Sequence, residues 1–154
     1  MDMSGEYRIE APIDVVWIAI QTPEILRNAI PGCEELDKTS DTEMAAKVAL
    51  KIGPVKAKFA GEVELQDLNA PHSLKIQGEG KGGIAGFAKG GADVQLAEDG
   101  DGTILTYRAS AQVGGKIAQL GSRLIQSTAA KLADKFFANL RDQLASEKKT
   151  NNSK

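Results

Sequence analysis

Leucine, threonine and phenylalanine recur at every fourth position near the carboxyl end of the chain. This stripe consists of Leu120, Leu124, Thr128, Leu132, Phe136, Leu140 and Leu144. A spacing of four is typical of a helix, whereas the apolar residues of a half-buried strand alternate. The pattern predicts one long amphipathic helix from Gly114 to Ser146. Because successive residues lie about 100° apart around a helix axis, the stripe winds around the helix, which should cross a twisted surface diagonally.

The first half of this predicted helix is poor in bulky side chains. Its small residues are Gly114, Gly115, Ala118, Gly121 and Ser122. A helix without bulk on the face toward a neighbouring layer either lies close to that layer or leaves a space beside it. This segment is therefore the first indication of where a ligand could lie.

The middle of the chain follows a period of two, which predicts β-strands. The clearest strand runs from Val55 to Gln66, and its inward-facing residues are Val55, Ala57, Phe59, Gly61, Val63 and Leu65. Similar alternation recurs, with short turns between, from Met44 to Leu50, Leu74 to Gly80, Ala88 to Leu96 and Leu105 to Ala111. Half-buried strands joined by short turns predict an antiparallel meander.

One strand and two short helices are predicted before the meander. Glu6 to Glu10 alternates, while Pro12 and Pro23 are each followed by an acidic residue and by apolar residues at helical spacing. Proline suits the first turn of a helix, and an early acid complements the positive end of the helix dipole. Thr22 is the expected N-cap of the second helix, which Pro31-Gly32 should end.

The fold class predicted from these elements is α+β. A curved antiparallel sheet should wrap around the long C-terminal helix, with the two short helices after the first strand. With 154 residues, of which 42% are apolar, the chain is expected to form a single domain over residues 1–146. Residues 147–154 are strongly polar and are expected to form a disordered tail.

The composition and charge of the chain argue against several classes of function. The chain has 19 basic and 21 acidic residues, so it offers no overall basic surface for nucleic acid. Met1 to Tyr7 do not show the basic and apolar regions of a signal sequence, and no apolar run has the length of a membrane span. The single cysteine, Cys33, cannot form an internal disulfide and fits a reducing compartment. A cytoplasmic protein that does not bind nucleic acid is therefore expected.

The predicted sheet is bulky at one end and small at the other. The end near the Asn69 and Gly100 turns collects Val63, Leu65, Leu74, Ile76, Val94, Leu96 and Leu105, and should be solidly packed. The end near the Gly82 to Gly86 turn collects Ala57, Gly61, Gly78, Gly80, Ala88, Gly90, Ala109 and Ala111, with Phe59 as the main large side chain. The thin half of the predicted helix should lie above this second end.

Small residues on both layers leave two arrangements open. The helix backbone can settle directly onto the strands, with the glycines allowing the sheet to bend. Alternatively, Phe59, Trp17 and the short helices hold the layers apart around an apolar cavity. Such a cavity would open near Ile30 to Gly32 and near the Gly82 to Gly86 hairpin.

The motifs that could carry catalysis or bind metals and nucleotides are weak. Gly78 to Gly83 fits the G-x-G-x-x-G pattern, but a strand and not a helix follows, so no helix amino terminus can hold a pyrophosphate. His72 is the only histidine and lies in a turn without companion ligands for a metal. Cys33 would need a base within hydrogen-bond distance to act as a nucleophile. We expect no metal ligand here.

Alternation places the strand acids Glu62, Glu64 and Glu79 on the solvent face, where nothing should raise their pKa for acid catalysis. We therefore expect no catalytic residue.

Tyr107 faces inward, and its hydroxyl needs either a protein partner or a ligand oxygen. Lys81 and Lys89 flank the glycine-rich hairpin, where they are either solvated or in contact with acidic lipid headgroups.

Five segments together carry a family resemblance. They are Pro12 with Val16-Trp17, Pro23 to Leu26, Ile30 to Glu34, Gly53 to Gly61 and Gly115 to Gly121. These segments resemble the family of carbon monoxide dehydrogenase G subunits, which belongs to the START-like, polyketide-cyclase-like superfamily with the helix-grip fold. The similarity extends from about Gly5 to Leu144, and Ile30-Pro31-Gly32-Cys33 and Gly53-Pro54-Val55 are its most specific parts.

The resemblance implies a non-catalytic accessory protein. Members of the family are associated with molybdenum-containing carbon monoxide dehydrogenases and related hydroxylases, and are described as linking them to the membrane quinone pool. The superfamily holds hydrophobic molecules between the long helix and the sheet, which favours the cavity. Ligand-binding residues implied by the resemblance are Phe59, Gly78, Gly80, Phe87, Ala88, Tyr107, Ala109, Ile117, Leu120, Gly121 and Leu124.

The resemblance implies that the ligand is a hydrophobic small molecule, an isoprenoid quinone or another lipid, bound without a covalent or metal cofactor. The implied partner is a carbon monoxide dehydrogenase-type molybdenum enzyme, with transient contact at the inner face of the cell membrane. The alternative is a ligand-free membrane-recruitment or assembly factor for the dehydrogenase. An enzyme of the cyclase or hydrolase kind would require an acid or a histidine inside the cavity.

Overall fold

The computed structural model describes the backbone of residues 1–152 and the side chains of residues 1–145. The disordered tail expected at residues 147–154 lies outside the part with described side chains. In chain order the elements are β1 (Asp2–Ile9), α1 (Ile13–Ala19), α2 (Pro23–Ala29), β2 (Cys33–Lys38), β3 (Glu43–Ile52), β4 (Val55–Asn69), β5 (Ser73–Lys81), the 3₁₀ helix η1 (Gly83–Ala85), β6 (Phe87–Asp99), β7 (Gly102–Gly114), the 3₁₀ helix η2 (Lys116–Leu120) and α3 (Ser122–Asn152).

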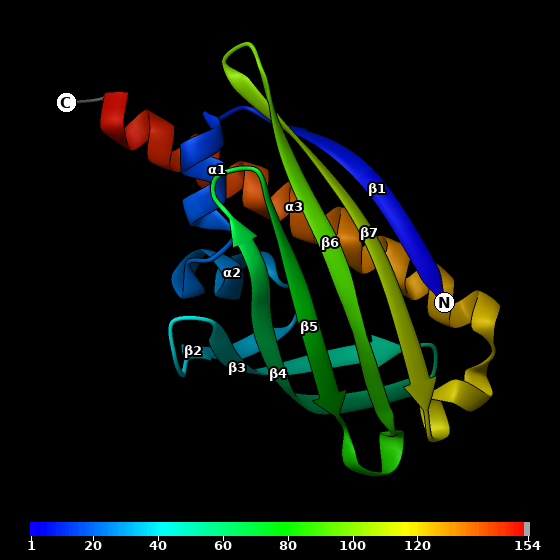
Figure 1. Cartoon of the computed structure of the whole chain (residues 1–154). Helices are drawn as coiled ribbons and strands as arrows, with labels where there is room; N and C mark the ends of the chain where they lie inside the picture. Colours follow the sequence, from blue (N-terminus) through cyan, green and yellow to red (C-terminus); the bar gives the residue numbers. More distant parts are fainter. Residues whose placement is uncertain (153–154) are drawn as a thin grey trace.

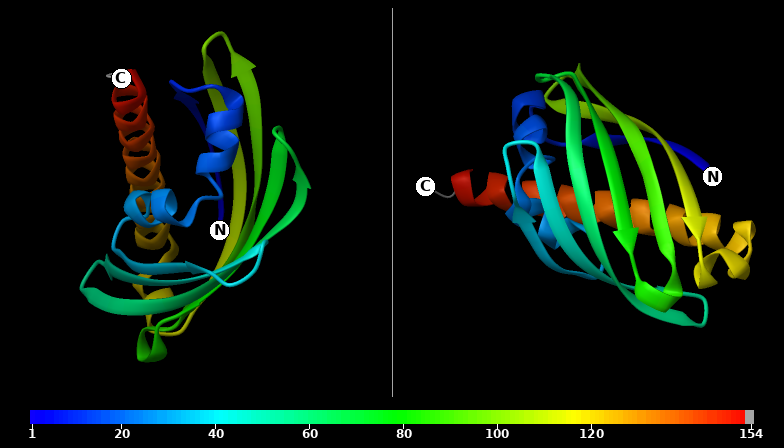
Figure 2. Two further views of the ribbon diagram at one scale, coloured as in Figure 1. Left: turned by 90° about the vertical axis from the view of Figure 1, so that its left-hand side faces the viewer. Right: turned by 60° about the horizontal axis from the view of Figure 1, so that its bottom comes forward.

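The strands form one seven-stranded sheet in the order β1-β7-β6-β5-β4-β3-β2. Every neighbouring pair is antiparallel, so β2 to β7 make a meander and β1 adds to the edge of β7. The sheet curves around α3, which crosses its concave side (Figures 1 and 2). The predicted α+β class, with two short helices after the first strand and a long helix at the end, is confirmed.

The alternation that predicted the strands also describes their faces. In β4, Phe59 and Leu65 are buried whereas Glu62 and Glu64 are exposed. The antiparallel register then brings inward residues together across the sheet, as in the pair of Leu96 with Leu105. The period of two therefore identified which side of each strand faces α3.

The short helices start close to the predicted positions, with two differences. Pro12 occupies the N-cap of α1 and not its first turn, while Pro23 is the first residue of α2. Thr22 is the N-cap residue of α2 as predicted, but its hydroxyl donates to the carbonyl oxygen of Ile18 at 2.6 Å and does not cap α2. After α2, Gly32 has a φ of +77°, a conformation that ends a helix readily.

Strand β2 is an element that the alternation did not predict separately. It contains mostly charged residues and pairs with β3 through an irregular register between Cys33 and Glu35. It is also the edge of the sheet. Charged residues are common on edge strands because they discourage pairing with other chains, so the absence of an apolar pattern follows from its position.

The prediction that the long helix begins at Gly114 is wrong. Strand β7 continues to Gly114, η2 follows, and α3 begins only at Ser122. Gly115 and Gly121 have φ angles of +81° and +95°, whereas every residue inside an α-helix has a negative φ. The small residues therefore form the connection between β7 and α3, and not a thin face of the helix.

Two hydrophobic clusters pack the sheet against the elements that cover its concave side. The larger cluster lies at the bulky end, where Leu74 and Leu105 pack in the same core as Phe137, Leu140 and Leu144 of α3. The smaller cluster, at the opposite end, consists of Phe59, Ala85 and Ile117 with their partly buried neighbours. The sheet is thus packed against α3 at the bulky end and against η2, which leads into α3, at the other end.

Helix α2 is attached to α3 by side-chain amides as well as by apolar packing. The amide of Asn139 donates to the carbonyl oxygen of Ala29 at 3.0 Å, and that of Gln143 donates to the carbonyl oxygen of Ile25 at 2.9 Å. These bonds satisfy side chains that the packing partly buries. They place α2 as a wall between α3 and the sheet at the bulky end.

Candidate functional site

An apolar cavity of about 710 Å³ lies between α3 and the concave face of the sheet. Its walls come from every strand except β2, from the segments around α1 and α2, and from η2 and α3. Small-molecule sites in proteins typically measure about 300–1,000 Å³. The cavity between α3 and the sheet therefore has the size of a small-molecule site.

The cavity exists because the facing surfaces are small while the supports beside them are large. On the sheet, the smallest wall residues are Gly61, Gly78, Gly80, Gly90, Ala109 and Ala111. On α3, Ala129 and Ala133 face them. The clusters around Phe59 and Phe137 hold the two layers apart at either end. Of the two arrangements left open by the sequence, the one with separated layers is present.

Most of the residues that the resemblance implied as ligand-binding do line the cavity: Phe59, Gly78, Gly80, Ala88, Tyr107, Ala109 and Ile117. The others, Phe87, Leu120, Gly121 and Leu124, are not among the lining residues. Phe87 is 42% exposed. Leu120 and Gly121 precede α3, which begins at Ser122, whereas Leu124 lies on α3 beside Gly53. Contact of any of these residues with a ligand stays a prediction.

Several wall residues were not predicted although the sequence carried a signal for some of them. Thr128, Leu132 and Phe136 belong to the stripe at every fourth position, and Val48 and Leu50 share the inward face of β3. Two further wall residues, Met1 and Met3, come from β1 and the residue before it. No signal pointed to them, because the alternation that predicted this strand began only at Glu6.

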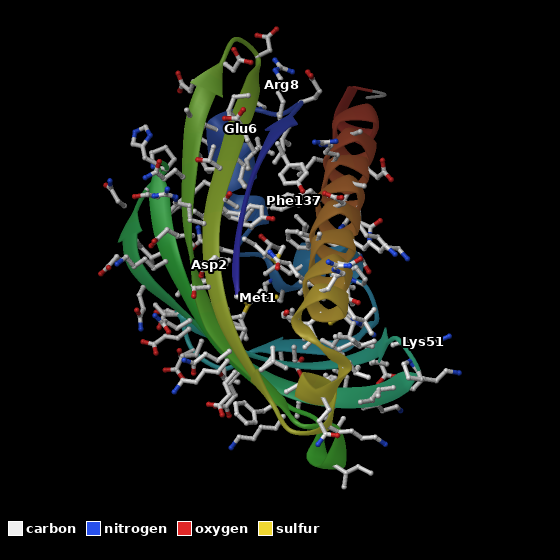
Figure 3. The ribbon with its side chains drawn as sticks, turned by 90° about the vertical axis from the view of Figure 1, so that its right-hand side faces the viewer. Met1, Asp2, Glu6, Arg8, Lys51 and Phe137 are labelled. Carbon is white, nitrogen blue, oxygen red and sulfur yellow. The ribbon has the colours of Figure 1, made fainter. Side chains whose placement is uncertain are left out.

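The residues at the two expected openings line the cavity only in part. Ile30 and Pro31 line it as expected, but no residue of the Gly82 to Gly86 hairpin does. Ala85 is instead buried in the smaller cluster, which fills that end. Met1 lines the cavity and is 38% exposed, so the wall reaches the surface at the start of β1. Figure 3 shows Met1 on this side, where β1 and α3 face each other.

Tyr107 lines the cavity and belongs to a group of three stacked aromatic rings. Its ring stacks with Tyr7 and Phe137 at centroid distances of 6.3 Å and 5.7 Å. Gly5 makes room for it, because a Cβ there would lie 2.7 Å from the Tyr107 Cε1 atom. The hydroxyl of Tyr7 donates to Asp134 Oδ1 at 2.6 Å. Figure 3 shows Phe137 between α3 and the sheet.

Both tyrosines remain protonated at neutral pH. Burial raises the pKa of Tyr107, the charge of Asp134 raises it further, and the Tyr7 hydroxyl acts in the opposite direction. Burial and the hydrogen bond to Asp134 also raise the pKa of Tyr7. Tyr107 therefore lines the cavity and keeps a neutral hydroxyl.

Neither Cys33 nor His72 has the surroundings that catalysis would require. Cys33 is half-buried, and its Sγ donates to the carbonyl oxygen of Glu35 at 3.3 Å. Burial raises the pKa of this thiol, which opposes formation of the reactive thiolate. His72 is exposed in the β4–β5 turn. Among the described residues, no group of His, Cys, Asp and Glu side chains is arranged to hold a metal ion.

Glu62, Glu79 and Lys89 also border the cavity, but their side chains are exposed. This agrees with the parity that placed the strand acids on the solvent face. In the described part of the chain, no helix combines the length and the apolar character that a membrane crossing requires.

Solved structures share this architecture along nearly the whole chain. A conserved protein from Geobacillus kaustophilus is 29% identical, with a TM-score of 0.89 over 95% of this chain and 96% of that one. A START superfamily protein from Mycobacterium smegmatis has a TM-score of 0.72 at 12% identity, over 94% and 97% of the two chains. A protein from Thermus thermophilus gives 0.72 at 16% identity, over 96% and 99%. The fold is therefore the START-like helix-grip fold.

A search of curated protein sequences finds no match. The model of the CoxG family, described as the G subunit of carbon monoxide dehydrogenase, matches residues 5–145. This range includes every strand from β2 to β7, the cavity walls that they form and most of α3. The match agrees with the extent of the resemblance found in the sequence, and the chain belongs to the CoxG family of carbon monoxide dehydrogenase G subunits.

Proposed function

We propose that the protein is a non-catalytic carrier that binds an isoprenoid quinone in the cavity and links a molybdenum-type carbon monoxide dehydrogenase to the membrane quinone pool. The observation that carries this proposal is the apolar cavity of about 710 Å³ between α3 and the sheet. Membership of the CoxG family supports the association with the dehydrogenase.

The chemistry of the walls suits a molecule with a long apolar part and a small polar head. Aliphatic side chains and glycines surround most of the cavity, and Tyr107 offers a neutral hydroxyl at one place. A prenyl tail gains free energy from every methylene that leaves water, at about 0.8 kcal/mol each. A quinone carbonyl can accept the Tyr107 hydrogen bond, which orients the head.

This proposal predicts a dependence of affinity on tail length. The dissociation constant should fall as isoprene units are added to a benzoquinone head, until the tail fills the cavity, and should then level off. Isothermal titration or quenching of the Trp17 fluorescence measures the series directly. Equal affinity for the head group alone and for the prenylated quinones would contradict binding in this cavity.

A variant that fills the cavity separates binding there from binding elsewhere. Ala109→Leu adds bulk to the cavity floor, while Ala97→Leu makes the same change at an exposed position of β6. We expect Ala109→Leu to weaken quinone binding at least tenfold, because overpacking by a few methylenes costs about 1–3 kcal/mol. Ala97→Leu should bind as the wild type does.

The same pair of variants tests the alternative of a ligand-free recruitment or assembly factor. If Ala109→Leu still supports transfer of electrons from the dehydrogenase to membrane quinone at the wild-type rate, the cavity is not used. The proposal predicts instead a loss of that transfer, with retained binding to the dehydrogenase. Ala97→Leu provides the reference for both measurements.

A further inference from the structure

Three connections meet at one end of the molecule, which we call the hairpin end. They are the Gly53-Pro54 turn between β3 and β4, η1 between β5 and β6, and η2 between β7 and α3. Ala85 of η1 packs with Phe59 and with Ile117 of η2 in one buried cluster. Figure 1 shows η1 at the tip of the β5–β6 hairpin, projecting beyond the rest of the sheet.

Two large apolar side chains are exposed on this tip. Ile84 is 91% exposed and Phe87 is 42% exposed, while Ala85 between them is buried. Gly83 and Gly86 have φ angles of +61° and +114°, which allow the tight reversal that leaves Ile84 outside. A single exposed apolar residue is common, but two on one projecting turn form a surface that can enter an apolar phase.

The hairpin end is strongly basic although the chain as a whole is slightly acidic. Residues 44–61, 80–92 and 102–133 contain no aspartate or glutamate. The basic residues near the three connections are Lys51, Lys56, Lys81, Lys89, Lys116 and Arg123. Among the described side chains, none of these forms an ion pair. Figure 3 shows Lys51 projecting from the β3–β4 hairpin.

Many acids of the sheet lie at the opposite end, whereas Glu79 and Asp2 lie nearer the hairpin end. Because the strands are antiparallel, the β2–β3, β4–β5 and β6–β7 turns lie away from the hairpin end. In or beside these turns are Asp41, Glu43, Asp67, Glu98, Asp99 and Asp101. The charges behind the formal net charge of −2 are thus unevenly distributed, with an excess of lysine at the hairpin end and many acids at the other end. Near an anionic surface this asymmetry orients the basic end toward it.

We infer that the hairpin end docks on an anionic lipid bilayer, with Ile84 and Phe87 entering the interface and the surrounding lysines contacting lipid headgroups. An apolar tip ringed by basic side chains matches a surface whose interior is apolar and whose headgroups are acidic. A basic residue close to such a surface strengthens binding about fivefold. An inserted isoleucine strengthens it about tenfold or more.

This inference deepens the proposed function and rests on it for its biological meaning. Phe59 and Ile117, which hold η1 in place, also line the cavity. Met1, where the cavity wall reaches the surface, pairs with Ala111 of β7, three residues before Gly114. At a rise of about 3.3 Å per residue, this opening lies about 10 Å along β7 from the hairpin end. Docking would therefore bring the cavity close to the lipid.

Vesicle co-sedimentation without any quinone tests the docking surface. Wild-type protein should bind vesicles that contain phosphatidylglycerol, bind vesicles of phosphatidylcholine far more weakly, and dissociate between about 0.05 M and about 0.5 M salt. Ile84→Ser should lower the bound fraction about tenfold. Ile18→Ser is the matched control, because Ile18 is a 63% exposed isoleucine on α1. It should bind as the wild type does.

Two further variants locate the contact. Replacing Lys81, Lys89 and Lys116 together by glutamine should weaken binding about a hundredfold. In a Cys33→Ser background, an environment-sensitive dye attached to a cysteine introduced by Ile84→Cys should shift to the blue on vesicle binding. The same dye attached through Ile18→Cys should not shift.

Specific results would overturn this docking surface. These are absence of binding to phosphatidylglycerol vesicles, equal binding of the Ile84→Ser and Ile18→Ser variants, or a blue shift at position 18 and not at 84. Failure to bind vesicles while the dehydrogenase binds through the same lysines would assign the hairpin end to an acidic protein surface. Since no quinone is present, these outcomes are independent of whether the cavity holds one.

Discussion

We propose that Tyr107 gives the apolar cavity its selectivity for a ligand. Its pKa is raised by burial, so it remains a neutral donor, and its ring is held against Phe137 at a centroid distance of 5.7 Å. Apolar walls alone distinguish ligands mainly by size, whereas a fixed donor distinguishes a quinone from a hydrocarbon of equal shape. The hydroxyl is thus where head-group recognition can be measured.

Tyr107→Phe should reduce quinone affinity about fivefold and leave the affinity for a prenyl hydrocarbon of similar length unchanged. The reason is that a hydrogen bond between neutral groups contributes about 0.5–1.5 kcal/mol, while the ring and its packing remain. Competitive titration of the two ligands provides the measurement. An equal change for both would mean that Tyr107 acts only through packing.

The hydrogen bond from Tyr7 to Asp134 makes a separate prediction about alkaline pH. The pKa of Tyr7 is raised in the folded protein, so its contribution to stability is complete below the ordinary tyrosine value of about 10 and is lost as the pH rises above it. Tyr7→Phe should lower the free energy of unfolding by about 1 kcal/mol near neutral pH. Its stability should fall less steeply than that of the wild type above about pH 10.

Urea unfolding of both proteins at several pH values checks this expectation. The difference between the two curves isolates Tyr7 from the lysines that titrate in the same range. A constant difference in the free energy of unfolding through the alkaline range would contradict a folded-state shift at Tyr7.

At the scale of the elements, the connection between β7 and α3 depends on two glycines with positive φ. Gly115 and Gly121 bracket η2. A Cβ at Gly115 would come within 2.5 Å of Gly86 Cα, whereas a Cβ at Gly121 meets nothing within 4 Å. The two positions therefore share a backbone requirement and differ in the space around them.

Gly115→Ala should destabilise the protein more than Gly121→Ala does. Both introduce backbone strain of about 1–3 kcal/mol, and only Gly115→Ala adds a contact with the backbone of η1. Chemical denaturation of the two variants measures the difference. Equal losses of stability would show that the backbone at Gly86 can move away from a methyl group at position 115.

These glycines also explain why the start of α3 could not be predicted from the sequence. Alternation predicted the meander and the inward face of β4, because a sheet covered on one side imposes a strict period of two. The stripe at every fourth position predicted α3 correctly from Leu124 onward. It did not reveal the break at Gly121, because the leucine spacing continues through η2 by coincidence while glycine conformation is set by tertiary contacts.

The cavity illustrates the same limit. Counting small residues located it between the sheet and the helix, but could not decide between close contact and separation. That decision depends on Phe59 and Phe137, whose packing partners come from elements far apart in the sequence. Leu120 and Gly121 were misplaced for the related reason that the start of the helix was extended across a glycine.

At the scale of the whole molecule, α3 packs on the sheet at the bulky end, η2 packs on it at the other end, and the cavity lies between. If this space is empty in the ligand-free protein, a larger side chain should enter it without the usual penalty of overpacking. Ala109→Leu is therefore expected to keep or raise the midpoint of thermal unfolding. In a close-packed core the same change would cost about 1–3 kcal/mol, or several degrees.

Ala109→Leu should reduce the stabilisation that a bound quinone gives to the protein. A saturating short-chain prenyl quinone, at about a hundred times its dissociation constant, should stabilise the wild type by about 2.7 kcal/mol. The Ala109→Leu variant should show little stabilisation at the same concentration. Thermal unfolding with and without the quinone measures this stabilisation. Equal stabilisation of both proteins would contradict binding of the quinone in the cavity.

The most direct measurement is the identity of the molecule that accompanies the protein from a quinone-containing cell. The wild type, the Ala109→Leu variant and the Ala97→Leu control are purified without detergent, extracted with organic solvent and analysed by mass spectrometry. The account predicts an isoprenoid quinone in near-stoichiometric amount in the wild type and in Ala97→Leu, and a much smaller amount in Ala109→Leu. Absence of quinone from the wild type, or equal amounts in all three proteins, would contradict it.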